Sequence, residues 1–344
     1  MKKYILLTAL LFSSVFSVKA QDGFENILLA DVADSQKLLQ AYFAPGMEGF
    51  INSMNNGWAH TAKVHKTLGF DISIGVSASA IPSERELFNI GALGLTSVSS
   101  TSSTASTFGG PNNTTMMTVN TTINGQAVSA NFEMPGGVKD DLPLNAVPAP
   151  VAQITVGLPW KMDAMVRFVP KLNIGEDDGS VEMLGLGLKK EITSWFGPLE
   201  KTPLHVSLLA AYTTMDVNYA IEDQTGDFSV QNAATSFSLN AFTVQALASL
   251  NFPIFNVYGG IGYNSGSASY DMTGTFTGTY QTGLPAPNDT VTRQLGVPRN
   301  LDFDASGFRT TVGARLSLGF FKIFADYTLQ NFNSITAGVA FSFR

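Results

Sequence analysis

"ITAGVAFSFR", residues 335–344, closes the chain with apolar side chains at every second position as far as Phe343. Side chains two residues apart lie on the same face of a strand, so one face of this segment is apolar and the other carries small or polar residues. The pattern predicts a β-strand with one apolar face. An aromatic residue at its end suits the rim of a barrel embedded in a lipid bilayer.

The same alternation recurs along the chain in segments of about ten residues or more. The strands of a soluble β-sandwich also alternate apolar and polar residues, but they are usually five or six residues long. Strands that span a membrane must be long and must close into a ring. We therefore predict an all-β fold, an antiparallel transmembrane β-barrel with an even number of strands between 10 and 14. The ten predicted strands are residues 68–80, 151–160, 163–174, 181–192, 205–220, 236–251, 255–270, 306–319, 321–330 and 335–343.

The stretch between the first two strands leaves the strand number open. Residues 87–96 are a possible further strand, residues 97–114 are a loop rich in Ser, Thr and Gly, and residues 115–133 are a hairpin centred on Asn124-Gly125. Asn-Gly is a strong signal for a two-residue hairpin turn. If the whole stretch lies outside the cell, ten strands span. If parts of it span, the number rises to 12 or 14.

The connections differ between the two predicted ends of the barrel. Short turns at 158–163, 193–203, 251–256 and 319–321 fall on the periplasmic side by parity, and longer polar loops fall on the external side. Aromatic residues gather in the short turns, so they predict an interfacial girdle. Its members are Trp160, Trp195, Phe196, Phe252, Phe255, Phe320, Phe321 and Phe343.

The first twenty residues have the features of a secretory signal peptide. Lys2 and Lys3 precede an apolar run from Tyr4 to about Phe16, and Ala20 stands before the expected cleavage point. No later segment is an uninterrupted apolar run of about 20 residues, and the chain has no Cys to carry a lipid or a disulfide. We expect domains at 1–20 (signal peptide), 21–66 (helical plug segment) and 67–344 (barrel), and the bacterial outer membrane as the location.

Charge argues against nucleic acid as a partner. The formal charge of −7 becomes −10 when the three lysines of the signal peptide are lost. Charged residues make up only 14% of the chain, against about 25% in typical soluble proteins. The expected surroundings of the mature chain are therefore outer-membrane lipid.

Residues 21–66 lack the strand pattern. A helix is expected with Asp34 or Ser35 as its N-cap and Pro45-Gly46 as its end, followed by a second short helix. The segment is long enough to plug a barrel lumen, or it lies loose in the periplasm. The plug contacts are predicted to be Leu38, Leu39, Tyr42 and Trp58.

Inward positions of the predicted strands indicate what the lumen holds. The apolar ones suit packing against a plug or a greasy ligand; the predicted binding residues among them are Leu209, Ala211, Met215, Val217, Phe237 and Leu239. The charged ones suit lumenal salt bridges or the head group of a ligand; they are Arg167, Lys171, Arg315 and Asp326, with Asp71 as a further inward charge. Arg315 and Asp326 lie on adjacent strands and are candidates to pair with each other.

Catalysis and metal binding have little support. His60, His65 and His205 are the only histidines, and none is followed by a motif of nucleophile and acid. His60 and His65 are five residues apart, which is a poor spacing for one helical face, and Cys ligands are lacking. We expect no enzyme activity, no metal and no cofactor.

A resemblance adds to this interpretation. A short helical N-terminal segment, a first long strand, a large external excursion and the unit "VPAPVAQITVGLPWKMDAMVRFVP" resemble the layout of FadL-type fatty-acid transporters. The closing sequence "SGFRTTVGARLSLGFFKIFADYTLQNFNSITAGVAFSF" resembles an uncharacterised family of outer-membrane proteins. FadL-type proteins have fourteen strands and an Asn-Pro-Ala stretch in their hatch, where this chain has "MNNGW" at 54–58.

The resemblance implies passive uptake of a hydrophobic small molecule through a plugged lumen. The expected stages are capture among the external loops, entry to the apolar lumenal patch, and release when residues around 44–60 shift. A non-transporting barrel that anchors surface loops or supports a partner complex is the main alternative, and a narrow hydrophilic pore is another. The C-terminal strand is the expected contact of the barrel-assembly machinery.

Overall fold

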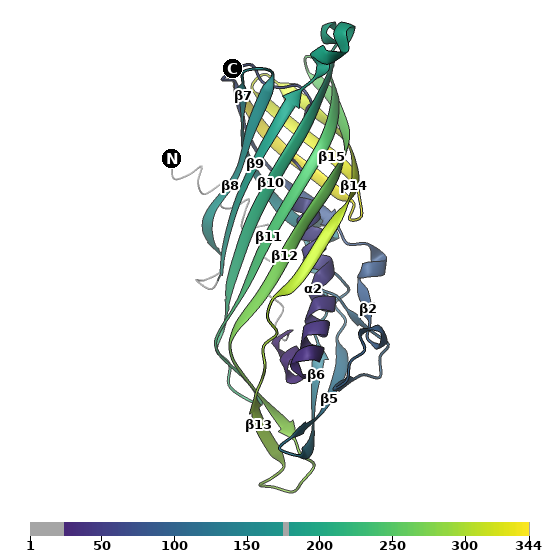
Figure 1. Ribbon diagram of the computed structural model, residues 1–344, viewed down its shortest axis with the longest axis vertical. Coiled ribbons are helices and arrows are strands. Elements are labelled where there is room, and N and C mark those ends of the chain that lie inside the picture. Colours follow the sequence, from purple (N-terminus) through teal and green to yellow (C-terminus); the bar gives the residue numbers. More distant parts are fainter. Residues whose placement is uncertain (1–23, 175–178, 344) are drawn as a thin grey trace.

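The computed structural model describes residues 24–174 and 179–343, so the predicted signal peptide lies outside the described residues. Within these ranges, ten antiparallel strands form a closed ring (Figure 1). In ring order they are β1 (Phe70–Ala80), β7 (Ala146–Leu158), β8 (Met162–Ile174), β9 (Gly179–Glu191), β10 (Leu204–Ile221), β11 (Phe228–Asn251), β12 (Phe255–Gln281), β14 (Leu301–Leu318), β15 (Phe321–Leu329) and β16 (Ser334–Phe343). β16 pairs with β1 and closes the ring, with Phe70 opposite Phe343.

The antiparallel barrel and all ten predicted strands are confirmed, at the lower limit of the predicted number. The largest differences lie at the end where the strands are longest. β11 begins at Phe228 rather than 236, and β12 continues to Gln281 rather than 270. In the β12 extension the alternating apolar residues Met272, Phe276 and Tyr280 are buried and the other face carries Thr, so this extension has no apolar outer face. The β11 extension is interrupted by a register shift between Gln231 and Ala234.

Short elements cover the end of the barrel that holds the longer loops. They are β2 (Leu87–Asn89), β3 (Val98–Ser99), β4 (Thr104–Ser106), β5 (Thr115–Ile123), β6 (Gln126–Met134) and β13 (Thr290–Gln294), with 3-10 helices η2 (Ser83–Arg85), η3 (Gly91–Leu93), η4 (Lys139–Asp141) and η5 (Pro143–Asn145). β5 and β6 form the predicted hairpin, and Asn124 and Gly125 both have positive φ, 53° and 83°, as a type I′ turn requires. The possible strand at 87–96 is wrong except for β2.

Short turns and the end of β16 occupy the other end (Figure 1). One connection there is the 3-10 helix η6 (Thr193–Lys201). The predicted girdle residues lie at this end, and most of them are exposed to solvent. Trp160 is 81% exposed because it sits at the tip of a tight turn with a φ of 62°.

The outer face of the ring is apolar around its circumference. Large side chains that would be buried in a soluble protein are exposed on it. They are Ile72, Ile154, Val166, Phe168, Leu184, Leu186, Leu188, Leu208, Tyr212, Phe242, Val244, Val257, Ile261, Phe308, Val312, Leu316, Leu318, Ile323, Tyr327, Leu329, Ile335 and Phe341.

The N-terminal segment forms η1 (Phe24–Leu29) and one long helix, α2 (Val32–Met54), and α2 contacts β1, β7, β11, β12 and β14. The predicted end of the helix at Pro45-Gly46 is wrong, because α2 passes through it. The connection between β4 and β5 supports the interrupted turn, since the Phe108 N–H donates to the Tyr42 carbonyl at 2.9 Å. The N-cap is Asp31 rather than Asp34 or Ser35, and residues 55–69, all of them described, do not form the predicted second helix.

Residues 24–69 run from one end of the barrel to the other. Near the start, the Tyr280 hydroxyl at the end of β12 donates to the Leu29 carbonyl at 2.7 Å. At the other end, the Leu68 N–H donates to the Gly157 carbonyl at 2.8 Å beside the short turns. We call residues 24–69 the plug. None of the helices within the described ranges has both the length and the apolar character needed to cross a membrane.

Candidate functional site

The first half of the plug packs against the wall through apolar side chains. The predicted contacts Leu38, Leu39 and Tyr42 are buried in the largest core cluster, which also contains Met215 and Leu239. The Phe43 ring lies 6.0 Å from Phe237 and 5.2 Å from Tyr270, centroid to centroid. Val217 and Phe237 are partly buried against the same cluster.

Trp58 begins a second apolar contact nearer the short turns. Trp58 and Ala62 pack with Met165, Leu209, Ala211 and Leu247. Glycine at position 187 makes room for the indole, because a Cβ there would lie 2.9 Å from the Trp58 ring. The predicted lumenal residues Leu209 and Ala211 are therefore covered by the plug.

Two buried arginines hold the last residues of α2. Arg167 on β8 donates to the carbonyls of Met54 and Asn56, at 2.9 and 3.0 Å, and Arg309 on β14 donates to the Asn55 carbonyl at 2.8 Å. The end of a helix leaves carbonyl groups without intrahelical partners and carries partial negative charge. The two guanidinium groups, on separate strands of the wall, donate hydrogen bonds to these carbonyls and place positive charge beside them.

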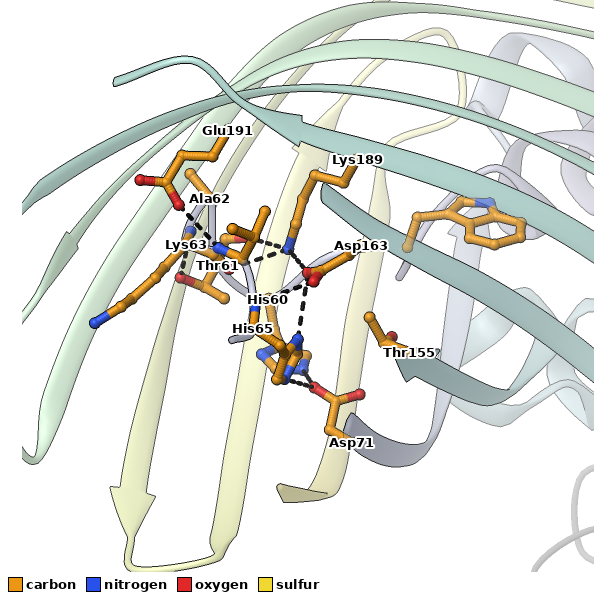
Figure 2. Close-up of polar contacts among 12 residues, drawn as sticks. His60, Thr61, Ala62, Lys63, His65, Asp71, Thr155, Asp163, Lys189 and Glu191 are labelled. Carbon is orange, nitrogen blue, oxygen red and sulfur yellow. Dashed lines mark hydrogen bonds and ion pairs between the residues drawn. The ribbon is translucent and has the colours of Figure 1, made fainter. Parts of the chain in front are cut away.

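A network of ionic contacts surrounds residues 60–65 of the plug (Figure 2). The ring nitrogens of His65 face two carboxylates, with Nε2 3.2 Å from Asp71 Oδ2 and Nδ1 3.3 Å from Asp163 Oδ2. Asp163 also accepts the backbone N–H of His65 at 2.9 Å and pairs with Lys189 at 3.0 Å. Because ionised carboxylates only accept, this geometry requires a doubly protonated His65.

Strand β9 contributes both signs of charge to the same contacts. Lys189 donates to the carbonyls of Thr61 and Lys63, both at 3.2 Å. Glu191 accepts the Val64 N–H at 3.1 Å and lies 2.9 Å from Nδ1 of His205. The backbone of residues 61–65 and the His65 side chain are therefore held by the wall, as Figure 2 shows.

His60 differs from His65 in its charge. Its Nε2 lies 3.3 Å from Asp71, while its Nδ1 lies 3.0 Å from Arg315 Nη1, which can only donate. Nδ1 is therefore an acceptor and the ring is neutral. Burial lowers the pKa of His60 below its usual range despite the bond to Asp71. Burial also opposes the charge on His65, but the bonds to Asp163 and Asp71 outweigh it and raise that pKa to about 9.

The predicted charged residues are not brought together. Lys171 is exposed, because the pairing of β8 with β9 shifts register between Val169 and Leu172, and its inward placement by parity is wrong. The suggested pairing of Arg315 with Asp326 is also wrong. Arg315 lies opposite Phe324, whereas Asp326 lies opposite Gly313 and accepts the Tyr258 hydroxyl at 2.9 Å.

Sequence reasoning missed several residues of the ionic contacts. Asp163, Lys189, Glu191 and Arg309 all occupy inward positions, so the same alternation would have identified them. The partner of His205, Glu191, comes from the neighbouring strand and follows only from strand register. Among the described residues, no group of three or more His, Cys, Asp or Glu side chains is placed to hold a metal ion.

The chain belongs to a protein family. Residues 1–343 match the family described as "Family of unknown function (DUF6588)". No curated protein matches the chain.

Several solved structures are similar to the chain at low sequence identity. The attachment invasion locus protein Ail of Yersinia pestis is 9% identical, with 80% of this chain and 99% of that chain covered and a TM-score of 0.25. The translocator domain of autotransporter NalP from Neisseria meningitidis is 11% identical, with 81% and 90% covered and a TM-score of 0.31. The TodX monoaromatic hydrocarbon channel is 9% identical, with 81% and 91% covered and a TM-score of 0.19. Similarities this low support no statement about cargo or partners, and the FadL-type resemblance stays unconfirmed.

Proposed function

We propose that the protein is a bacterial outer-membrane β-barrel that admits a small apolar molecule when its plug moves. The membrane location is supported by the exposed apolar outer face, which on β14 runs from Phe308 to Leu318. This is the length that a tilted spanning strand needs, about 9–11 residues. The exposed aromatic residues beside the short turns suit the interface with lipid head groups.

The observation that carries the uptake proposal is the chemical difference between the two halves of the plug. The first half meets the wall through apolar groups such as Phe43, Phe237 and Tyr270. An apolar cargo from outside would compete with α2 for that surface, because burial of apolar area is not directional. The second half is held by directional ionic contacts, so it acts as the latch that must open before cargo leaves.

A disulfide lock tests whether the plug moves during uptake. Ser53 Oγ in α2 lies 2.7 Å from Ser79 Oγ in β1, and the chain has no native Cys. The variant Ser53→Cys/Ser79→Cys should cross-link the plug to the wall within disulfide reach. Cells that depend on the barrel for apolar substrates should lose uptake when this variant is oxidised and regain it after reduction. Ser53→Cys alone is the matched control.

A non-transporting barrel is the second candidate. It would display the short elements β2 to β6, η2 to η5 and β13, which we call the external cap. It is favoured by the two buried arginines, since removing a buried charge from its partners costs several kcal/mol. Uptake that is equal in the oxidised lock, the reduced lock and a gene deletion would support this candidate and remove the transport proposal.

A further inference from the structure

A cavity of about 300 Å³ lies where the plug leaves the barrel at the end with the short turns. It lies between the plug, the turn from β14 to β15 and the last residues of β16, including Phe343. Its basic lining residues are Lys63, His65, Lys66, Arg315 and Lys322, and no acidic residue lines it.

Three of these basic residues, Lys63, Lys66 and Arg315, have no carboxylate partner within the described residues. Within the described residues, no carboxylate lies within 4 Å of a charged nitrogen of Lys63, Lys66 or Arg315, although Arg315 contacts His60. The Nε of Arg315 is buried without a hydrogen-bond partner. Burying a cation without a partner is costly, and a bound anion removes that cost.

The nearby carboxylates are already engaged by other donors. Asp71 contacts His60 and His65, and Asp163 contacts His65 and Lys189. Glu191 contacts His205 and the Val64 N–H. Lys63 and Lys66 therefore stay without a carboxylate partner on the cavity side of these contacts.

We propose that this cavity binds a phosphate-bearing anion that bridges the plug and the barrel wall. A phosphate group carries up to two negative charges and three acceptor oxygens, which match two lysines and one guanidinium. The volume is at the lower end for ligand cavities and suits a head group rather than a whole lipid. The phosphate comes either from a phospholipid of the inner leaflet, whose interface Phe343 faces, or from a soluble phosphate compound.

Such a ligand would strengthen plug closure. Lys63 and Lys66 belong to the plug, whereas Arg315 belongs to β14, so an anion between them adds contacts that exist only when the plug is docked. A ligand that binds one of two states shifts the equilibrium by its difference in affinity. The anion site does not depend on the transport proposal, because it would also stabilise a barrel that carries no cargo.

Purified full-length protein in mild detergent allows a direct test. Binding of inorganic phosphate is measured by calorimetry, and retained phosphatidylglycerol by native mass spectrometry. Lys63 and Lys66 are exposed, so Lys63→Gln/Lys66→Gln should leave the fold intact. The variant Lys171→Gln/Arg299→Gln is the matched control, since it removes the same charge from exposed sites outside the cavity.

The double lysine variant should bind at least tenfold more weakly than the wild type, and the control variant should bind equally well. One phospholipid retained by the wild type and lost from the lysine variant identifies the lipid source. Phosphate binding with the same dependence on the two lysines, without retained lipid, identifies a soluble source. No binding by the wild type, or equal binding by all three proteins for both probes, would overturn the proposal.

Discussion

The guanidinium carbon of Arg167 lies 4.1 Å from the centroid of the Trp58 ring. This cation–π contact joins the polar and apolar ways in which the wall holds the plug. One side of the guanidinium meets the indole, while its Nη atoms donate to carbonyls at the end of α2. Both residues are almost completely buried, so this contact is stronger than it would be in water.

Arg167→Gln should loosen the plug. The change removes the stacked cation and leaves the carbonyls of Met54 and Asn56 without their donor. We expect a loss of about 2–4 kcal/mol in plug docking. Hydrogen exchange of residues 54–58, followed by mass spectrometry, measures it. The exposed Arg299→Gln variant should retain wild-type protection; equal protection in both variants would contradict the role of Arg167.

Gly187→Val should displace Trp58 from its seat. Even a Cβ at this position lies 2.9 Å from the indole, and overpacking of this kind costs about 1–3 kcal/mol. Trp58 is 2% exposed, whereas Trp160 and Trp195, the other two tryptophans, are 81% and 68% exposed. In a background with Trp160→Phe and Trp195→Phe, emission from Trp58 alone should shift to longer wavelength. Gly91→Ala, in the external cap, should leave the emission unchanged.

The charge on His65 predicts that plug docking weakens at alkaline pH. Because the pKa of His65 is raised to about 9, the stabilisation is fully present below the ordinary pKa of about 6.5 and is lost as pH rises through 9. The contribution is on the order of 3 kcal/mol. Trp58 emission between pH 6 and pH 10 measures it, with His65→Gln as the comparison. If the two proteins respond equally to pH, His65 is not the group that titrates.

The barrel was predictable because its signal is local. Alternation at Phe341 and Phe343, and the Asn124-Gly125 turn, follow from side-chain direction and turn chemistry within a few residues. The course of α2 was not predictable in this way. Pro45 normally ends a helix, and only tertiary contacts such as that of Phe108 with Tyr42 allow the helix to continue.

The candidate site was predictable only in part, for a similar reason. Inward parity identified Arg167 and Leu209 as lumenal, but it failed at Lys171, where one bulge changes the face. The spacing of His60 and His65 is poor for one face of a helix. These residues lie in irregular chain, and both reach Asp71.

The direction in which the plug threads the barrel gives a last prediction. Asp31, just before α2, lies 3.8 Å from Arg293 of β13, so the start of the plug belongs to the end with the long loops. Val32→Cys and Leu284→Cys, both at exposed positions there, should react with a membrane-impermeant maleimide on intact cells. Trp195→Cys, in η6 at the opposite end, should react only after the outer membrane is permeabilised.

The background for this labelling is clean because the chain has no native Cys. The labelling results test the orientation of the barrel and the position of the plug separately. Labelling of Trp195→Cys on intact cells would show that the barrel has the opposite orientation in the membrane. Labelling of Leu284→Cys but not of Val32→Cys would keep the barrel orientation and show that the plug does not reach the outer end, since both positions are exposed in the docked state.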